Sequence, residues 1–272
     1  MMRSLWSAAS GMKGQQTAVD TIANNLANVN TVSFKSQNTQ FKSLLYQTLQ
    51  NQSTNSAGNT KPTNVQVGLG TRVASINTSF AQGAPQANDS KTALYIAGEG
   101  FFAFKGLDGE THYTRNGNFG WSLNAAKQRI LATTDGNPVL DRNGAEIVLP
   151  DGASGDAVGF SSEGELTYRD NTGNTVSTGL FVALYQFPNA VGLSKIGGSN
   201  FDATLSSGEA LPEWSTNGLV PSEISQGYLE MSNVNVADEM VNLIVAQRAY
   251  EMNSKAITTS DSMLETANGL KR

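Results

Sequence analysis

The feature that most constrains this chain is a seven-residue apolar pattern at each of its two ends. Near the start, mostly apolar side chains recur at alternating intervals of three and four residues. They are Leu5, Ala8, Met12, Gln15, Val19, Ile22, Leu26 and Val29. This spacing places them on one face of an α-helix and is typical of a coiled coil. We therefore expect a long helix that pairs with another helix.

The other end of the chain repeats the pattern. The recurring positions are Val236, Met240, Leu243, Gln247, Tyr250, Ser254, Ile257, Asp261 and Leu264. A second apolar row, formed by Val241, Ile244 and Val245, lies beside the first, so the apolar face is wider than one partner helix requires. In a compact monomer the two helices would pair through a single seam on each. The width therefore favours packing against helices of the same and of adjacent subunits.

Between these ends the sequence consists of short apolar runs separated by turn dipeptides. The dipeptides are Asp108-Gly109, Asn116-Gly117, Asp135-Gly136, Asn143-Gly144, Asp151-Gly152 and Asn217-Gly218. Asn-Gly and Asp-Gly between apolar runs are strong hairpin signals. Residues 50–64 contain no large apolar residue and are expected to form a loop.

The pattern predicts an α+β fold, in which N- and C-terminal helices form an α-helical coiled coil and a central domain is antiparallel β. We expect residues 1–30 and 232–272 to form the helical domain. Residues 31–70 and 221–231 are expected to be connecting extended or loop segments, and residues 71–220 the β domain.

Composition excludes several classes of function. Only 15% of the residues are charged, the net charge is −5, and there is no basic block, so nucleic acid is not an expected partner. There is no cysteine, and His112 is the one histidine, so we expect no catalytic residues, no metal site and no cofactor. The chain shows neither a cleavable signal peptide nor a stretch of about 20 apolar residues that would insert in a membrane.

Five segments carry a resemblance to a known family. They are MRSLWSAASGM, NNLANVNTVSFK, AGEGFFAF, YTRNGNF and SNVNVADEMVNLIVAQRAYEMNSKAITTSDSML. Together they resemble the flagellar basal-body rod and hook family along essentially the whole chain. The resemblance implies a non-enzymatic structural subunit that polymerises into a hollow, rigid tube. The terminal helices would form the inner layer of that tube and the β domain its outer layer.

Within this family the chain best fits the distal rod, the drive shaft that transmits torque from the motor to the hook and passes axial subunits through its channel. The region from 44 to 70 looks like the rod type, and we expect it to bridge neighbouring protofilaments. The implied partners are other copies of the chain, other rod proteins, the hook protein, the type III export apparatus, and the L- and P-ring bushing. The implied location is the flagellar basal body, in the cell envelope or periplasm, reached by export without a cleaved signal peptide.

The resemblance also implies which residues join the subunits. Subunit packing is expected from Leu5, Met12, Val19, Ile22, Leu26, Val236, Met240, Leu243, Ile244, Tyr250, Ile257 and Leu264. Family-motif and inter-subunit polar roles are expected for Asn24, Asn25, Asn28, Thr31, Phe34, Lys35, Asn233, Asn235 and Arg248. Among the asparagines, Asn28 and Asn30 are expected to end the helix, while Asn24 and Asn25 are expected to bond between subunits.

One position departs from the family pattern. The family commonly has glycine where this chain has Ser33, and glycine would suit a turn with positive φ. A serine costs more in that conformation, so the turn is a point where the geometry can differ.

Two alternatives remain open from the residues. One is a proximal rod or hook subunit of the same family. The other, from a different class, is a secreted carbohydrate-binding or enzymatic β domain with coiled-coil arms. A pocket holding carboxylates, or measurable glycan binding by the β domain, would favour the second.

Overall fold

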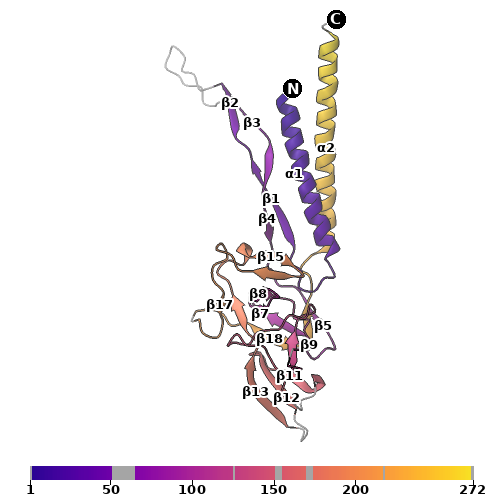
Figure 1. Ribbon diagram of the computed structural model, residues 1–272. Coiled ribbons are helices and arrows are strands. Elements are labelled where there is room, and N and C mark those ends of the chain that lie inside the picture. Colours follow the sequence, from indigo (N-terminus) through magenta and orange to yellow (C-terminus); the bar gives the residue numbers. More distant parts are fainter. Residues whose placement is uncertain are drawn as a thin grey trace. The chain divides into compact units, whose positions relative to one another are not determined.

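The computed structural model describes residues 2–50, 65–124, 126–150, 155–169, 174–216 and 218–270. The expected loop at 50–64 lies, from residue 51 onward, outside the described residues, as do Asp151-Gly152 and Asn217. The chain is α+β, with two long helices and many short antiparallel strands (Figure 1). It divides into two compact units: unit 1 is Met1–Ala27, Gln37–Thr78 and Asn235–Arg272, and unit 2 is Asn28–Ser36 and Ser79–Val234.

Unit 1 contains both helices and the first four strands. Its elements are α1 (Met2–Ala27), β1 (Gln37–Ser43), β2 (Tyr46–Gln50), β3 (Val65–Gly68), β4 (Thr71–Thr78) and α2 (Val236–Gly269). β1 pairs with β4 and β2 pairs with β3, both antiparallel. Four strands therefore lie in unit 1 within or beside the stretch expected to be a connecting segment.

The ends of both helices follow from local chemistry. At the start of α2, Asn235 is the N-cap, and its side chain accepts a hydrogen bond of 3.1 Å from the Ala237 N–H. Asp238 and Glu239 in the first turn complement the positive end of the helix dipole. α1 ends at Ala27, and the following turn is closed by a bond from the Thr31 N–H to the Asn28 carbonyl. Asparagine thus follows the helix end, as expected.

Unit 2 holds the remaining strands. They are β5 (Pro85–Ala87), β6 (Leu94–Ala97), β7 (Phe101–Lys105), β8 (Thr111–Thr114), β9 (Gly120–Leu123), β10 (Arg129–Ala132), β11 (Val158–Phe160), β12 (Glu165–Arg169), β13 (Thr175–Phe181), β14 (Leu184–Gln186), β15 (Ser194–Gly197), β16 (Asn200–Asp202), β17 (Leu211–Pro212), β18 (Glu223–Gln226) and β19 (Tyr228–Glu230). Two short 3-10 helices, Gly155–Ala157 and Ala190–Gly192, complete the described elements.

The largest sheet has the order β15-β16-β8-β7-β14-β17, and a three-stranded sheet has the order β11-β12-β13. Three two-stranded pairs join β10 to β9, β18 to β6, and β19 to β5. The central strand β7 is buried along most of its length because its two faces support different core clusters. Phe102 belongs to one cluster and Phe101 to the other.

The turn dipeptides behave differently from one another. Asp108-Gly109 forms the expected hairpin turn between β7 and β8, and Gly109 has a positive φ. Asn116-Gly117 was expected to form a hairpin, but the flanking strands β8 and β9 do not pair with each other. Gly117 is required for another reason: a Cβ there would lie 1.7 Å from the Leu94 carbonyl oxygen, so the backbones approach too closely for any side chain.

Candidate assembly surface

Within unit 1, α1 and α2 pack side by side and antiparallel (Figure 1). Three cross-helix contacts are spaced by multiples of seven residues: Ser4 with Ser260, Gly11 with Asn253, and Asn25 with Glu239. The two serine hydroxyls lie 3.3 Å apart, and Asn25 Nδ2 donates to Glu239 Oε1 at 3.1 Å. We call this line of contacts the seam.

Small side chains explain why the seam runs where it does. A Cβ on Gly11 would lie 2.9 Å from Asn253 Nδ2, so the helices are closest where α1 has no side chain. Ala18 and Ala246 occupy the corresponding positions one heptad further, and both are buried. The helices therefore meet through small and polar residues, and the large apolar side chains lie to either side.

The residues expected to pack subunits flank this seam. Those on α1 sit one position beside it or further round the helix and are half-buried: Leu5, Met12, Val19, Ile22 and Leu26. On α2, three are half-buried: Leu243, Ile257 and Leu264. The other four are exposed: Val236, Met240, Ile244 and Tyr250. Their packing against other subunits remains a prediction.

Exposed large apolar side chains gather on the surface of the first half of α2. We call this surface the apolar stripe; it consists of Val236, Met240, Val241, Ile244, Val245 and Met252. Their exposed fractions run from 44% to 67%, values that are high for large apolar side chains on the ordered helix of a folded unit. Next to the seam, a groove is lined by Gln16, Val19, Gln247, Tyr250 and Glu251.

One exposed residue of the stripe, Met252, and one of α1, Trp6, belong neither to the predicted packing residues nor to the second apolar row. Met252 is 67% exposed and Trp6 on α1 is 73% exposed. Both lie off the three-and-four spacing, so the periodicity gave no signal for them. The available sequence signal was a tryptophan that lies off the predicted apolar face of a helix with few charges.

A larger side chain in the seam should separate the helices. Ala18→Leu is expected to destabilise unit 1 by about 1–3 kcal/mol, because the seam has no space for the added atoms. Urea titration followed by far-UV circular dichroism measures the change. Ala23→Leu, on the exposed side of α1, is the matched control and should have little effect. Equal stability of the two variants would show that the seam is not close-packed.

At the end of the seam nearest the C-terminus of α1, Asn25 is fully buried. Its Nδ2 donates to the Gln37 carbonyl at 2.8 Å as well as to Glu239, and its Oδ1 accepts from the Gln37 N–H at 2.9 Å. The amide of Asn25 thus joins α1, β1 and α2 of one chain. The bond between subunits expected for it stays a prediction. Asn24 is exposed, and its Nδ2 lies 3.4 Å from Gln37 Oε1.

Glu239 gives the seam a pH dependence. Burial raises the pKa of its carboxyl above the usual 4.5, although the Asn25 hydrogen bond lowers it in part and Asp238 raises it further. Because the pKa is raised in the folded state, ionising this carboxyl costs the folded protein stability. The cost is absent below pH 4.5 and grows as the pH rises from 4.5 through the folded-state pKa. Unit 1 therefore loses stability over that interval.

Glu239→Gln is expected to stabilise unit 1 at neutral pH, since the neutral amide can still accept the Asn25 bond. The difference from the natural sequence should shrink to nothing as the pH falls below 4.5. Thermal melts of both proteins across this range test the idea. A variant that is less stable at pH 7 would show that the carboxylate is favourable where it lies.

The segment after α1 belongs to unit 2 and contains the departure from the family pattern. Ser33 adopts φ +55°, the conformation that a glycine at this position would suit. Two hydrogen bonds compensate for the strain: the Ser33 N–H donates to the Glu230 carbonyl at 2.8 Å and its hydroxyl donates to the Arg115 carbonyl at 2.7 Å. Because Ser33 is completely buried, these bonds are made away from water.

Two residues further on, Lys35 enters a buried ion cluster with Glu230 and Arg115. Lys35 Nζ lies 2.7 Å from Glu230 Oε1, and Arg115 Nε lies 3.1 Å from Glu230 Oε2. The three side chains are at most 2% exposed. Burial lowers the pKa of Lys35, the charge of Glu230 raises it and Arg115 lowers it, with a net lowering. One carboxylate therefore serves two cations inside unit 2.

The cluster engages the family-motif residue Lys35 within one chain. Its remaining contact is a 2.9 Å hydrogen bond to the Ala81 carbonyl, and Glu230 Oε1 also accepts from the Gly83 N–H at 2.8 Å. The lysine thus ties residues 33–35 to β19, the last strand before α2. This contact between sequence-distant charged residues has no local sequence signal.

The other polar positions have varied surroundings. Asn233 is bonded within unit 2, donating to the Ser79 and Ala81 carbonyls and accepting from the Ser36 N–H. The Asn28 side chain accepts from the Thr31 hydroxyl at 3.0 Å, and the Phe34 ring lies 5.2 Å from Lys195 Nζ. Arg248 forms an exposed ion pair with Glu251 at 3.1 Å, which contributes about 0–1 kcal/mol.

His112 is held between two carboxylates, Asp202 on Nδ1 and Asp108 at 3.1 Å from Nε2. Burial lowers its pKa, but the combined hydrogen bonds and charges of Asp202 and Asp108 outweigh that effect, so the pKa lies above its usual value. Neither contact supplies a nucleophile. In the described part of the chain, no three His, Cys, Asp or Glu residues are grouped to hold a metal ion. Of the helices described, none is long and apolar enough to cross a membrane.

Three family models match the chain. The description "Flagella basal body rod protein" covers residues 5–35, "Flagellar hook protein FlgE/F/G D1 domain" covers 95–168, and "Flagellar basal body rod FlgEFG protein C-terminal" covers 225–270. The three members of the ion cluster fall one in each matched segment.

Curated relatives match along the whole chain. A protein from Borreliella burgdorferi named flagellar basal-body rod protein FlgG is 43% identical over 277 aligned residues, covering all of both chains. The protein of that name from Bacillus subtilis is 39% identical over 272 residues, again covering all of both. A second Bacillus subtilis protein, flagellar hook-basal body complex protein FlhP, is 30% identical over 278 residues with the same coverage.

Proposed function

This chain belongs to the flagellar basal-body rod family FlgEFG, and from that membership we propose that it is a structural subunit that polymerises into the distal rod. The rod it builds is a hollow, rigid drive shaft that transmits torque from the motor to the hook and lets axial subunits pass through its channel. Within one organism, Bacillus subtilis, the chain is more similar to the basal-body rod protein FlgG, at 39% identity, than to the hook-basal body complex protein FlhP, at 30%. A proximal rod or hook subunit is the alternative within the family.

The observation that carries the proposal is the apolar stripe. Burying one large aliphatic side chain contributes about 1.5–3 kcal/mol, and the six residues of the stripe stay exposed although α2 is already paired with α1. In a rod, the partner that covers this surface is a second copy of the chain. The half-buried α1 residues Leu5, Met12 and Val19 would extend the same interface.

In the polymer we assign the terminal helices, residues 1–30 and 232–272, to an inner coiled-coil layer. Residues 71–220 form the outer layer, and residues 31–70 and 221–231 connect the two. Support for the inner layer comes from the antiparallel pairing of α1 and α2 and from the low charge of α1, which carries only Arg3, Lys13 and Asp20. Neutral polar surfaces can be buried between subunits without the cost of desolvating ions.

The β2–β3 ribbon is a second candidate contact between subunits. Its flanking and internal apolar residues are exposed, with Leu45 at 83% and Tyr46 at 62%. An isolated two-stranded ribbon is marginally stable in water, so it gains from a partner surface. We propose that residues 44–70 bridge neighbouring protofilaments and stiffen the rod.

The proposed partners are other copies of the chain, the other rod proteins, the hook protein, the type III export apparatus, and L- and P-ring bushing proteins around the rod. The proposed location is the flagellar basal body within the cell envelope, reached without a cleaved signal peptide. We assign no catalytic activity, since the titratable groups described above are engaged in structural contacts.

Electron microscopy of concentrated full-length protein tests the proposal. Straight hollow tubes, formed alone or on isolated hook-basal-body templates, are the expected result. Curved tubes would favour a hook subunit. Protein that stays monomeric even on the templates would contradict a polymerising subunit.

A further inference from the structure

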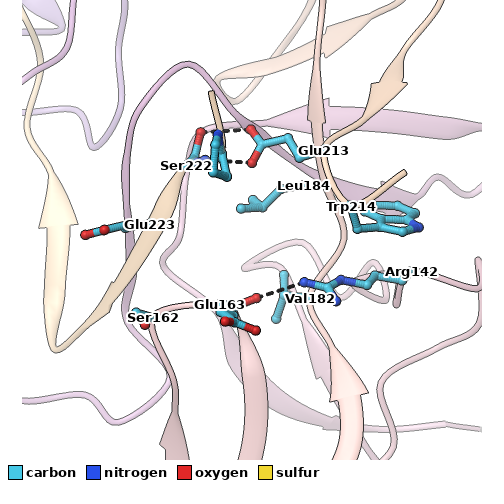
Figure 2. A pocket seen from close by; sticks show the side chains of 10 residues that line it. Arg142, Ser162, Glu163, Val182, Leu184, Glu213, Trp214, Ser222 and Glu223 are labelled. Atoms are coloured by element: carbon cyan, nitrogen blue, oxygen red, sulfur yellow. Dashed lines mark hydrogen bonds between the residues drawn. The ribbon is translucent and has the colours of Figure 1, made fainter. Parts of the chain in front are cut away.

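A cavity of ≈ 360 Å³ opens in unit 2, of a size that holds a small ligand (Figure 2). Its floor is apolar and buried, formed by Val182 and Leu184. Trp214 stands at one end, 36% exposed, while Glu163 and Glu223 lie on the exposed rim. The cavity therefore combines an apolar base with a polar border.

One wall of the cavity is fixed by a hydrogen-bond network. Glu213 Oε2 accepts from the Ser222 N–H at 2.8 Å, and its Oε1 accepts from the Ser222 hydroxyl and from Gln186 Nε2, each at 2.8 Å. Ser222 is buried. A carboxylate with three donors is held in place before any ligand arrives, so this wall is preorganised.

Arg142 limits the charge of a ligand. Its guanidinium lies 4.0 Å from the centroid of the Phe181 ring and 5.8 Å from that of Trp214, and its Nη2 donates to the Glu163 carbonyl at 3.2 Å. The cation position beside the aromatic rings is thus already filled, which disfavours a basic ligand. Around the pocket the three carboxylates of Glu163, Glu213 and Glu223 outnumber the one guanidinium of Arg142, and this net negative charge disfavours an anionic ligand.

A neutral ligand remains, and it must offer hydroxyl or amide donors at its edge and an apolar face for the floor and the indole. A pyranose ring has this combination, with C–H groups on its face and hydroxyls around its rim. We infer that this pocket is a binding site for one neutral sugar unit of a polysaccharide. The assignment does not depend on polymerisation, because all of the residues that line the pocket belong to unit 2.

Nuclear magnetic resonance on unpolymerised full-length protein tests the inference. The chain has three tryptophans, so the indole N–H signal of Trp214 can be identified with a Trp214→Phe variant. Maltotriose, cellotriose and triacetylchitotriose serve as probes. At least one should shift the Trp214 signal with a dissociation constant on the order of 1 mM, as expected for a single small subsite.

Glu223→Gln and Glu163→Gln should each weaken that binding by about tenfold, while the exposed Glu110→Gln, outside the pocket, should leave it unchanged. A folded spectrum outside the pocket separates lost binding from lost structure. The inference is overturned by no shift with any probe at about 10 mM, or by shifts that both pocket variants retain. It is also overturned if tetralysine displaces the sugar from this site, which would mark the pocket as a receptor for basic chains.

Discussion

Glu230→Gln is expected to destabilise unit 2 by about 3–5 kcal/mol, because it leaves Lys35 and Arg115 buried without a counter-charge. Such a loss is a large part of the stability of an ordinary domain. Glutamine keeps the shape of the side chain and can still accept the Gly83 bond. The expected loss therefore comes from charge rather than from an empty space.

The loss should depend on pH through Lys35. Its pKa is already lowered in the folded protein, and removing Glu230 takes away the charge that raises it. When a folded-state lysine pKa lies below the unfolded value, stability rises as the pH rises between the two. The defect of Glu230→Gln should accordingly be greatest near neutral pH and should shrink under alkaline conditions.

Urea unfolding followed by tryptophan fluorescence measures the effect, since Trp121 and Trp214 lie in unit 2. Glu110→Gln, at an exposed position, is the matched control. A triple variant with methionine at positions 35, 115 and 230 should recover most of the lost stability, because apolar replacement of a whole buried ion group is tolerated far better than removal of one partner. A Glu230→Gln protein as stable as the control would show that the cluster does not stabilise the fold.

Ile244→Asp is expected to prevent polymerisation while leaving the monomer folded. Ile244 is 54% exposed in the middle of the apolar stripe, so an aspartate there is solvated in the free subunit. In the polymer the same aspartate would be buried without a partner, at a cost that exceeds the lost contribution of the isoleucine. The critical concentration for assembly should rise by at least about 100-fold, which corresponds to about 2.7 kcal/mol.

The matched control for this variant is Thr259→Asp, which adds the same charge to an exposed position in the second half of α2. It lies outside the stripe and should assemble nearly normally. Sedimentation of polymer from monomer gives both critical concentrations, and far-UV circular dichroism verifies the helices. Equal assembly of the two variants would remove the stripe from the interface.

The sequence predicted the helices well and their contact poorly. The three-and-four spacing located both helices, and α1 ends three residues before the predicted boundary at residue 30 because the asparagines form the turn. The seam, however, runs through Ser4, Gly11 and Ala18, each one position before a predicted apolar residue. Periodicity selects large apolar side chains as the core, whereas close antiparallel packing selects small ones.

For unit 2, the sequence predicted an antiparallel β structure but not which strands pair with each other. Turn dipeptides indicated antiparallel strands, yet the pairs β18–β6 and β19–β5 join strands more than 120 residues apart, for which no local pattern exists. The same holds for Lys35 and Glu230. No pattern near Lys35 in the sequence indicates that it is buried against a carboxylate 195 residues away. At Ser33 the family pattern left the turn geometry open, and the structure gives a positive φ together with two hydrogen bonds that no sequence pattern indicated.

The most direct test of the central claim is a helical reconstruction of the polymer by electron cryomicroscopy. The claim is that the apolar stripe of α2 is the principal surface through which subunits join. The reconstruction should show Val241, Ile244 and Val245 buried against a helix of a neighbouring subunit. A polymer in which these three side chains face the channel or the solvent, with subunits joined through unit 2 alone, would contradict the claim.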